Sequence, residues 1–249
     1  MIRKLPSEDW NKLKEELAPY WHEVYFLLLA LDSGRHLKEV YIAEDKGKVI
    51  GILAIRKSNK AHLHMTAALT EEWTALLKSK ALKSLLVSER VYRLISGGDL
   101  VKAHHRTSLI MTRYEAPFDM QDTLTPLSIE ELSEVDELYR MEMPGALSLE
   151  GMRRNYEKGG FGVGIRRHDK LVSVAQVSEV SKDQGFVFGV VVIEKFRGQG
   201  LGKRVMQGLL SLESSKGLTL HLLTDNPLAI GLYEQLGFKA NGKMIEAVL

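Results

Sequence analysis

Three glycines between an apolar run and a helical pattern constrain this chain more than any other feature of its sequence. The stretch FRGQGLGKRV covers residues 196–205 and holds Gly198, Gly200 and Gly202, with Arg197 and Lys203 on either side. The run FVFGVVVIE before it is typical of a strand, and the apolar spacing behind it predicts a helix, at Leu201, Val205, Leu209 and Leu212. Glycine lets backbone approach a ligand closely, and a helix N-terminus favours an anion. The pattern therefore indicates a phosphate or pyrophosphate site.

Two common phosphate-binding motifs do not fit this stretch. A dinucleotide fingerprint requires G-x-G-x-x-G, and here the third glycine comes one residue early. A P-loop requires Ser or Thr after its Gly-Lys pair, and here Arg204 follows Lys203. The glycines alone leave two interpretations open, an anion-binding loop and a plain turn that starts a helix.

The C-terminal half alternates helical and strand-like segments. Residues 115–128, EAPFDMQDTLTPLS, are the best linker candidate. A capping box, SIEE, has Ser128 at the N-cap and predicts a helix, and a second helix is expected over 148–158. Strand-like runs follow at 161–167, 171–180, 186–194 and 218–224. In DNPLAIGLYEQLGF, Asn226 is the expected N-cap of a last helix and Pro227 its first residue.

The N-terminal half repeats part of this pattern. VYIAEDKGKVIGILAIRK, residues 40–57, places Val49 over Leu171 and Ile52 over Val174 when laid on FGVGIRRHDKLVSVAQV. A helix before it and a strand and helix after it extend the parallel. We predict an α/β (α+β) protein of two related halves, 1–118 and 119–249, each a mixed, mostly antiparallel sheet flanked by helices.

Composition limits the class of protein and its partners. The longest apolar run, YFLLLAL at 25–31, is far below the roughly 18–20 residues of a membrane span, and MIRKLPSEDW is no secretory signal. The absence of cysteine excludes thiol chemistry and fits a cytoplasmic protein. A net charge of +2 does not favour nucleic acid or membrane binding. The basic stretch 78–93, KSKALKSLLVSERVYR, is interpreted as a solvated helix face.

GVVVIEKFRGQGLGKRV followed by DNPLAIGLYEQLGF resembles the GNAT superfamily of acetyl-CoA-dependent N-acetyltransferases. The family's cofactor motif is a V-x-V strand followed by R/Q-x-x-G-x-G/A, and its next motif is N-x-x-A-x-x-x-Y-x-x-x-G-F. The resemblance covers about residues 125–249. One departure is visible, because a proline common before the loop is replaced around Ile193-Glu194. The resemblance implies two parallel strands that splay apart in the C-terminal half, with acetyl-CoA entering the gap as co-substrate. The expected cofactor-binding residues are Val190, Val191, Val192, Arg197, Gly198, Gln199, Gly200, Leu201, Gly202, Lys203, Asn226, Ala229 and Tyr233.

The resemblance also assigns chemical roles. Tyr233 is expected to protonate the departing CoA thiolate, although a half-buried packing tyrosine is the plainer interpretation. A backbone N–H at Val191 or Val192 would polarise the thioester carbonyl. The general base is not evident: Glu179 is the first candidate and Glu142 the second, and solvated surface carboxylates are the commoner case. MEMPGALSLE, residues 141–150, is expected to line the acceptor site.

The first half is not expected to bind CoA. Where its phosphate loop should stand it reads MTAALTEEWTALL, with Thr70 as N-cap and the carboxylates of Glu71 and Glu72 in the first turn. Histidines at 62, 64, 104 and 105 are interpreted as solvated or capping residues, and no metal is expected.

The favoured function is an N-acetyltransferase acting on a small-molecule or peptide amine, by direct attack in a ternary complex. The rival is a non-catalytic acyl-CoA sensor or interaction module. The identity of the acceptor and the oligomeric state, a homodimer included, stay open.

Overall fold

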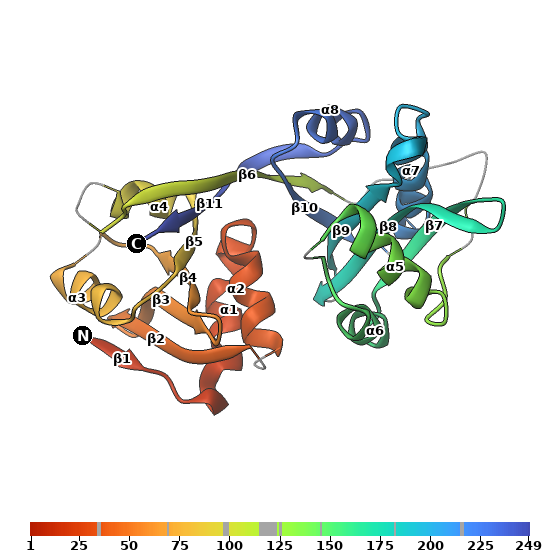
Figure 1. The fold of residues 1–249 in the computed structure, drawn as a ribbon. Coiled ribbons are helices and arrows are strands. Elements are labelled where there is room, and N and C mark those ends of the chain that lie inside the picture. Colours follow the sequence, from red (N-terminus) through yellow and green to blue (C-terminus); the bar gives the residue numbers. More distant parts are fainter. Residues whose placement is uncertain are drawn as a thin grey trace. The chain divides into compact units, whose positions relative to one another are not determined.

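A computed structural model describes residues 1–33, 36–68, 70–96, 100–114, 124, 126–144, 146–181, 183–214 and 217–249 (Figure 1). Two compact units make up the chain. The first comprises Met1–Ile110, Leu223–Asp225 and Ala240–Leu249, and the second Met111–Leu222 and Asn226–Lys239. The predicted boundary at 118/119 and most of the predicted linker 115–128 fall outside the described residues.

The first unit is a mixed sheet with helices on both faces. Its elements are β1 (Ile2–Lys4), α1 (Leu13–Leu17), α2 (Trp21–Ser33), β2 (Leu37–Asp45), β3 (Lys48–Arg56), β4 (Lys60–Met65), α3 (Glu71–Ser79), β5 (Ser84–Ser88), α4 (Glu89–Ile95), most of β6 (Ala103–Arg113) and most of β11 (Lys239–Val248). The strand order is β1-β2-β3-β4-β5-β11-β6. Of the pairs in the described ladders, only β4 with β5 is parallel.

The side chains of β3 alternate between two cores, as period-2 burial requires. Ile52 and Ala54 pack with residues of α1 and α2. Leu53 and Ile55 pack instead with Trp73 of α3 and other residues of α3 and α4. A strand that is apolar on both faces therefore forms the middle of a helix–sheet–helix sandwich.

The second unit has the same layering. Its elements are α5 (Leu132–Glu142), α6 (Leu149–Glu157), β7 (Phe161–Arg167), β8 (Lys170–Ser181), β9 (Gln184–Val192), α7 (Leu201–Ser214), most of β10 (Thr219–Thr224) and α8 (Pro227–Gln235). The strand order is β10-β9-β8-β7, with β9 and β10 parallel and the other pairs antiparallel. Helices α5 and α6 pack on one face, against Val174 and Val191, and α7 contacts β7, β8 and β9 (Figure 1).

Most expected elements are confirmed, with two corrections. The regular part of α5 begins at Leu132, three residues after the first residue of the predicted helix; Glu131 still accepts the Ser128 N–H (2.8 Å), so half of the capping box forms. The stretch 78–93 is not one helix, because Ser84–Ser88 forms β5, parallel to β4. The apolar run Leu85-Leu86-Val87 is typical of a buried strand and does not suit a solvated helix face. No helix in the described ranges combines the length and apolarity that crossing a bilayer requires.

Candidate active site

The candidate site lies in the second unit, where strands β9 and β10 diverge. They pair over three positions only, from Thr219 with Gln184 to His221 with Phe186. At this closed end the His221 ring Nε2 lies 2.6 Å from the Gln184 side-chain oxygen, which fastens the two strands together. Beyond it, no ladder joins β9 to β10 in the described part of the chain. The predicted splay is thus present.

The far end of β9 offers backbone groups to the opening. Ile193 donates its N–H to Val172 of the β8 side, and the Val191 carbonyl accepts from the Ser173 hydroxyl. Because successive residues of a strand direct their backbone groups to opposite edges, Val192 faces the opening. Its carbonyl accepts the Arg197 Nε–H at 3.1 Å.

A bulge interrupts β9 just before these valines. Val174 pairs with Val191 and Gln176 with Phe188, so one residue of β8, Ala175, opposes both Gly189 and Val190. Gly189 has φ +62°, a left-handed conformation that suits glycine. The bulge re-aims the strand edge next to the opening.

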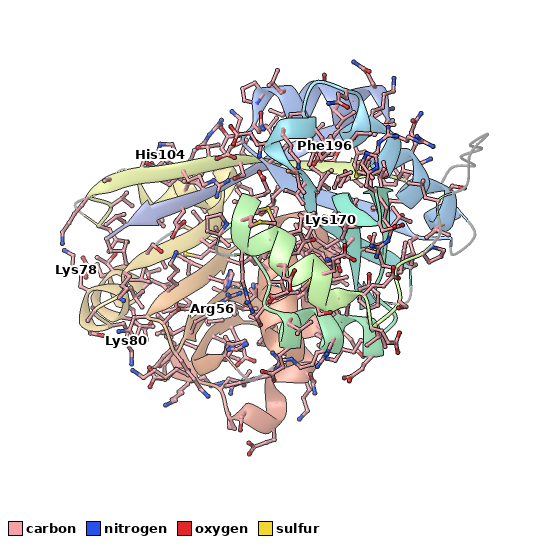
Figure 2. All side chains as sticks on the ribbon, turned by 45° about the vertical axis from the view of Figure 1, so that its right-hand side comes forward. Arg56, Lys78, Lys80, His104, Lys170 and Phe196 are labelled. Atoms are coloured by element: carbon pink, nitrogen blue, oxygen red, sulfur yellow. The ribbon has the colours of Figure 1, made fainter. Side chains whose placement is uncertain are left out.

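The glycine loop joins β9 to α7 through a short 3₁₀ turn, Glu194–Phe196, whose Phe196 is labelled in Figure 2. Gly198 and Gly200 have φ of +75° and +74°, a conformation that favours glycine, and an added Cβ would meet no atom within 4 Å. Gly202 has no such φ, and a Cβ there would make only ordinary contacts of 3.7 and 3.8 Å.

The backbone donors of this loop are available to an anion. Among the described residues, no hydrogen bond engages the N–H groups of 198–203; the first helical bond of α7 runs from Arg204 to the Gly200 carbonyl. These groups stand at the N-terminus of a 14-residue helix, whose dipole favours negative charge. The donors fit a pyrophosphate.

Arg197 and Glu142 form one contact that fixes the loop. The Arg197 Nη2 lies 2.6 Å from one Glu142 carboxylate oxygen, and the Glu194 N–H donates to the other at 3.1 Å. The Glu142 side chain is only 13% exposed. The second predicted base therefore has both oxygens engaged, and the guanidinium is directed at Glu142 and Val192.

Helix α8 carries the remaining predicted residues. Asn226 is its N-cap, accepting the Leu228 N–H at 3.0 Å, so the capping interpretation is confirmed. Tyr233 is 7% exposed, lies 5.8 Å from the Phe238 ring, and burial raises its pKa to about 12. It therefore keeps its proton at neutral pH. Glu179 pairs with Gly185 in the β8–β9 ladder, and its side chain lies outside the described residues.

A cavity of about 500 Å³ opens at the end of α5. It is lined by residues of the predicted acceptor segment 141–150, with Asp136, Tyr139 and Arg140 of α5 completing it. Met143, Pro144 and Leu147 give it an apolar wall. Asp136 is buried and holds the start of α6 by accepting the Leu149 N–H at 3.1 Å, beside its ion pair with Arg140.

Residues 129–238 match the acetyltransferase (GNAT) family. The C-terminal half belongs to this family. It is 31% identical over 83 residues to the N-alpha-acetyltransferase RimI of Mycobacterium tuberculosis, covering 32% of this chain and 52% of that protein. It is 34% identical over 61 residues to the glucosamine 6-phosphate N-acetyltransferase of Trypanosoma brucei brucei, covering 24% of this chain and 42% of that protein. The chain thus spans about half or less of these relatives' lengths.

Solved structures extend the likeness in fold to the whole chain. A GNAT acetyltransferase from Colwellia psychrerythraea has a TM-score of 0.66 at 14% identity, covering 100% of this chain and 99% of that one. A tandem GNAT protein from the clavulanic acid biosynthesis pathway has a TM-score of 0.56 at 13% identity, covering 100% and 98%. The predicted tandem GNAT build is confirmed.

The first unit also has an opening between two parallel strands, β4 and β5, and Arg90 of the same unit bridges it. Strands β4 and β5 also pair over three positions only. Arg90, just after β5, donates to the carbonyl of Met65 at the end of β4 (2.7 Å) and to Glu23 (2.8 Å). Thr70 caps α3 by accepting the Trp73 N–H, and Glu72 accepts the Ile2 N–H at 2.7 Å. The helix end that would face a phosphate therefore has a side-chain cap and two carboxylates in its first turn.

His62 and His64 of β4 are buried, at 6% and 5% exposed, so the prediction that they are solvated or capping residues is wrong for these two. His62 accepts from Arg56 at 3.0 Å, and His64 packs on the Tyr20 ring at 4.8 Å. Burial lowers the pKa of His62 to about 3 and that of His64 to about 4. Among the residues described, no three His, Cys, Asp or Glu side chains group as metal ligands.

Three residues of the GNAT half escaped the sequence analysis. Tyr139, Gln176 and Gly189 meet at the bulge, where the Tyr139 hydroxyl donates to the Gly189 carbonyl at 2.9 Å. Tyr139 follows Leu138 in an amphipathic helix and resembles a core residue. The glycine inside the strand run FVFGVVV was the available signal, since such a glycine suggests a bulge.

Proposed function

We propose that the C-terminal half transfers an acetyl group from acetyl-CoA to a primary amine, by direct attack in a ternary complex. The observation that carries this proposal is the strand opening between β9 and β10, beside a glycine loop whose backbone N–H groups have no partner in the part of the chain that the structure describes. Family membership supports acetyl transfer, and the two relatives named above are both N-acetyltransferases by their names. The absence of cysteine excludes a cysteinyl acyl-enzyme.

The cofactor-binding residues divide into two groups. The N–H groups from Gly198 to Lys203 would hold the pyrophosphate, with positive φ at Gly198 and Gly200 shaping the loop. The β9 edge from Val190 to Val192 would pair with the amides of the pantetheine arm, as an added strand would. The predicted contacts outside these two groups are Arg197, Asn226, Ala229 and Tyr233. When bound, acetyl-CoA supplies the thioester that the amine attacks.

Two groups of the protein would handle charge during transfer. The Val192 N–H faces the opening and is the better placed of the two predicted donors to the thioester carbonyl. Tyr233 holds a proton at its buried hydroxyl for the departing thiolate, since its pKa is raised to about 12.

The two predicted carboxylates differ in how well each could accept the proton of the amine. Glu142 already accepts from Arg197 and from Glu194, so we assign it the role of fixing the loop. Glu179 stays the proposed base, acting through water. The acceptor amine would enter the cavity at the end of α5, whose apolar wall suits a small molecule or peptide with an apolar portion beside its amine.

The test is thiol release from acetyl-CoA across a panel of amines, amino acids and peptides, with Tyr233→Phe beside wild type. We expect turnover with at least one amine, and a fall in kcat of about 10²-fold or more in the variant at unchanged CoA affinity. Phe238→Leu is the matched control, because it alters the ring beside Tyr233 but not the hydroxyl. Tight CoA binding without turnover on any amine would instead identify a sensor.

A further inference from the structure

The geometry points to Tyr139, held by Gln176, as a positioning residue that fixes the β9 bulge and thereby aims the strand edge at the thioester. This inference rests on the proposed function. Tyr139 belongs to α5 and is 2% exposed, while Gln176 belongs to β8 and is fully buried. Neither side chain faces bulk solvent, so their contacts are internal to the second unit.

The bulge removes the Gly189 carbonyl from the β8–β9 ladder. With two β9 residues opposite Ala175, a regular ladder does not serve the Gly189 carbonyl, and the Tyr139 hydroxyl donates to it at 2.9 Å. The fit leaves no space: a Cβ on Gly189 would come within 1.7 Å of the Tyr139 hydroxyl oxygen. Tyr139 therefore sets where the bulge stands.

Gln176 fixes the direction in which the Tyr139 hydroxyl donates its proton. Because the Tyr139 proton is given to Gly189, its oxygen accepts from Gln176, whose Nε2 lies 2.7 Å away. The same Nε2 lies 3.3 Å from the Met152 sulfur. Burial raises the pKa of Tyr139, so the hydroxyl stays a donor throughout the neutral range.

The contact between Gln176 and Tyr139 leaves the side-chain oxygen of Gln176 unsatisfied. The Gln176 Oε1 is buried and has no partner within the described residues. A buried amide oxygen without a partner destabilises a fold, and an apolar residue would avoid this. Gln176 therefore holds the Tyr139 hydroxyl in place but lowers the stability of the fold. Such a cost is expected where the geometry of a site is more important than stability.

The experiment compares Tyr139→Phe with Tyr156→Phe in the full chain. Tyr156 lies on α6 in the same cluster, and its buried hydroxyl also has no partner among the described residues, so its removal is the matched control. With the best amine from the panel, we expect Tyr139→Phe to lower kcat about 10-fold or more, with the Kd of CoA changed less than about twofold. Amide exchange at 188–192 should quicken in Tyr139→Phe and not in Tyr156→Phe.

A kcat for Tyr139→Phe within about twofold of wild type would overturn the inference. So would a loss of kcat matched by an equal loss of CoA affinity, which indicates a general structural role. If Tyr139→Phe does not fold, Gln176→Met carries the test and should lower kcat in the same direction. A wild-type chain that turns over no amine refutes the proposed function and the transfer role together, and the exchange comparison still decides whether Tyr139 fixes the bulge.

Discussion

Gly200→Ala tests the claim that the glycine loop is shaped by backbone conformation. Gly200 has φ +74° with no atom near its missing Cβ, so the variant meets no clash and changes only the backbone preference. A left-handed conformation costs an L-residue about 1–2 kcal/mol. If the loop keeps its shape, the free energy of unfolding falls by that amount. If it relaxes, CoA binding must restore the shape, and Kd rises about 5- to 30-fold.

Gly202→Ala is the comparison in the same loop. Gly202 lies in α7 with an ordinary φ, and an added Cβ there makes only van der Waals contacts, so alanine should raise the free energy of unfolding by up to about 1 kcal/mol. Calorimetry with CoA and thermal unfolding of both variants measure the two effects. The reasoning is refuted if Gly200→Ala leaves both stability and CoA affinity at wild-type values. A loss of affinity in Gly202→Ala alone would show that the ligand, and not strain, requires glycine there.

Two further predictions concern charged and titrating groups. Glu142→Gln removes the ion pair with half-exposed Arg197 but keeps an acceptor for the Glu194 N–H. The Kd for CoA should therefore rise up to about fivefold, with kcat preserved at saturation. If Glu142 were the general base, the variant would instead lose kcat at unchanged Kd. His62 has a folded pKa of about 3, below its unfolded value of about 6.5, so the unfolded state binds the proton first. Stability should therefore fall as pH drops from about 6.5 toward 3, by up to about 1.4 kcal/mol per pH unit, and less steeply in His62→Gln, as denaturant titrations at several pH values would show.

The sequence predicted the features that depend on local pattern. Asn226 before Pro227 predicted a capped helix, and the cap is present. Apolar runs on both sides of glycine turns predicted the strands of both halves. The loop from Gly198 to Gly202 was predicted from strand–glycine–helix order, and the left-handed φ of its first two glycines explains why that residue type stands there.

Features that depend on contacts between distant residues were not predictable in this way. Glu142 and Arg197 are 55 positions apart, so their pairing appears only when the end of α5 meets the loop. Tyr139 and Gly189 are separated by 50 positions, and an amphipathic pattern does not distinguish a tyrosine that donates a hydrogen bond from one that only packs. The limits of α5 and the strand β5 were also misassigned, because tertiary pairing overrides local preference.

The two units share an opening between parallel strands but differ in how the groups beside it are engaged. Each has a parallel pair joined over three positions. In the second unit no described residue bonds the loop N–H groups of 198–203, and the Arg197 guanidinium contacts Glu142. In the first, Arg90 bridges to Met65 and a threonine caps the helix that would face a phosphate. Since the architecture is shared, the capacity to bind an anion must lie in the few residues between strand and helix, and any function assigned to the first unit must be argued from its own side chains.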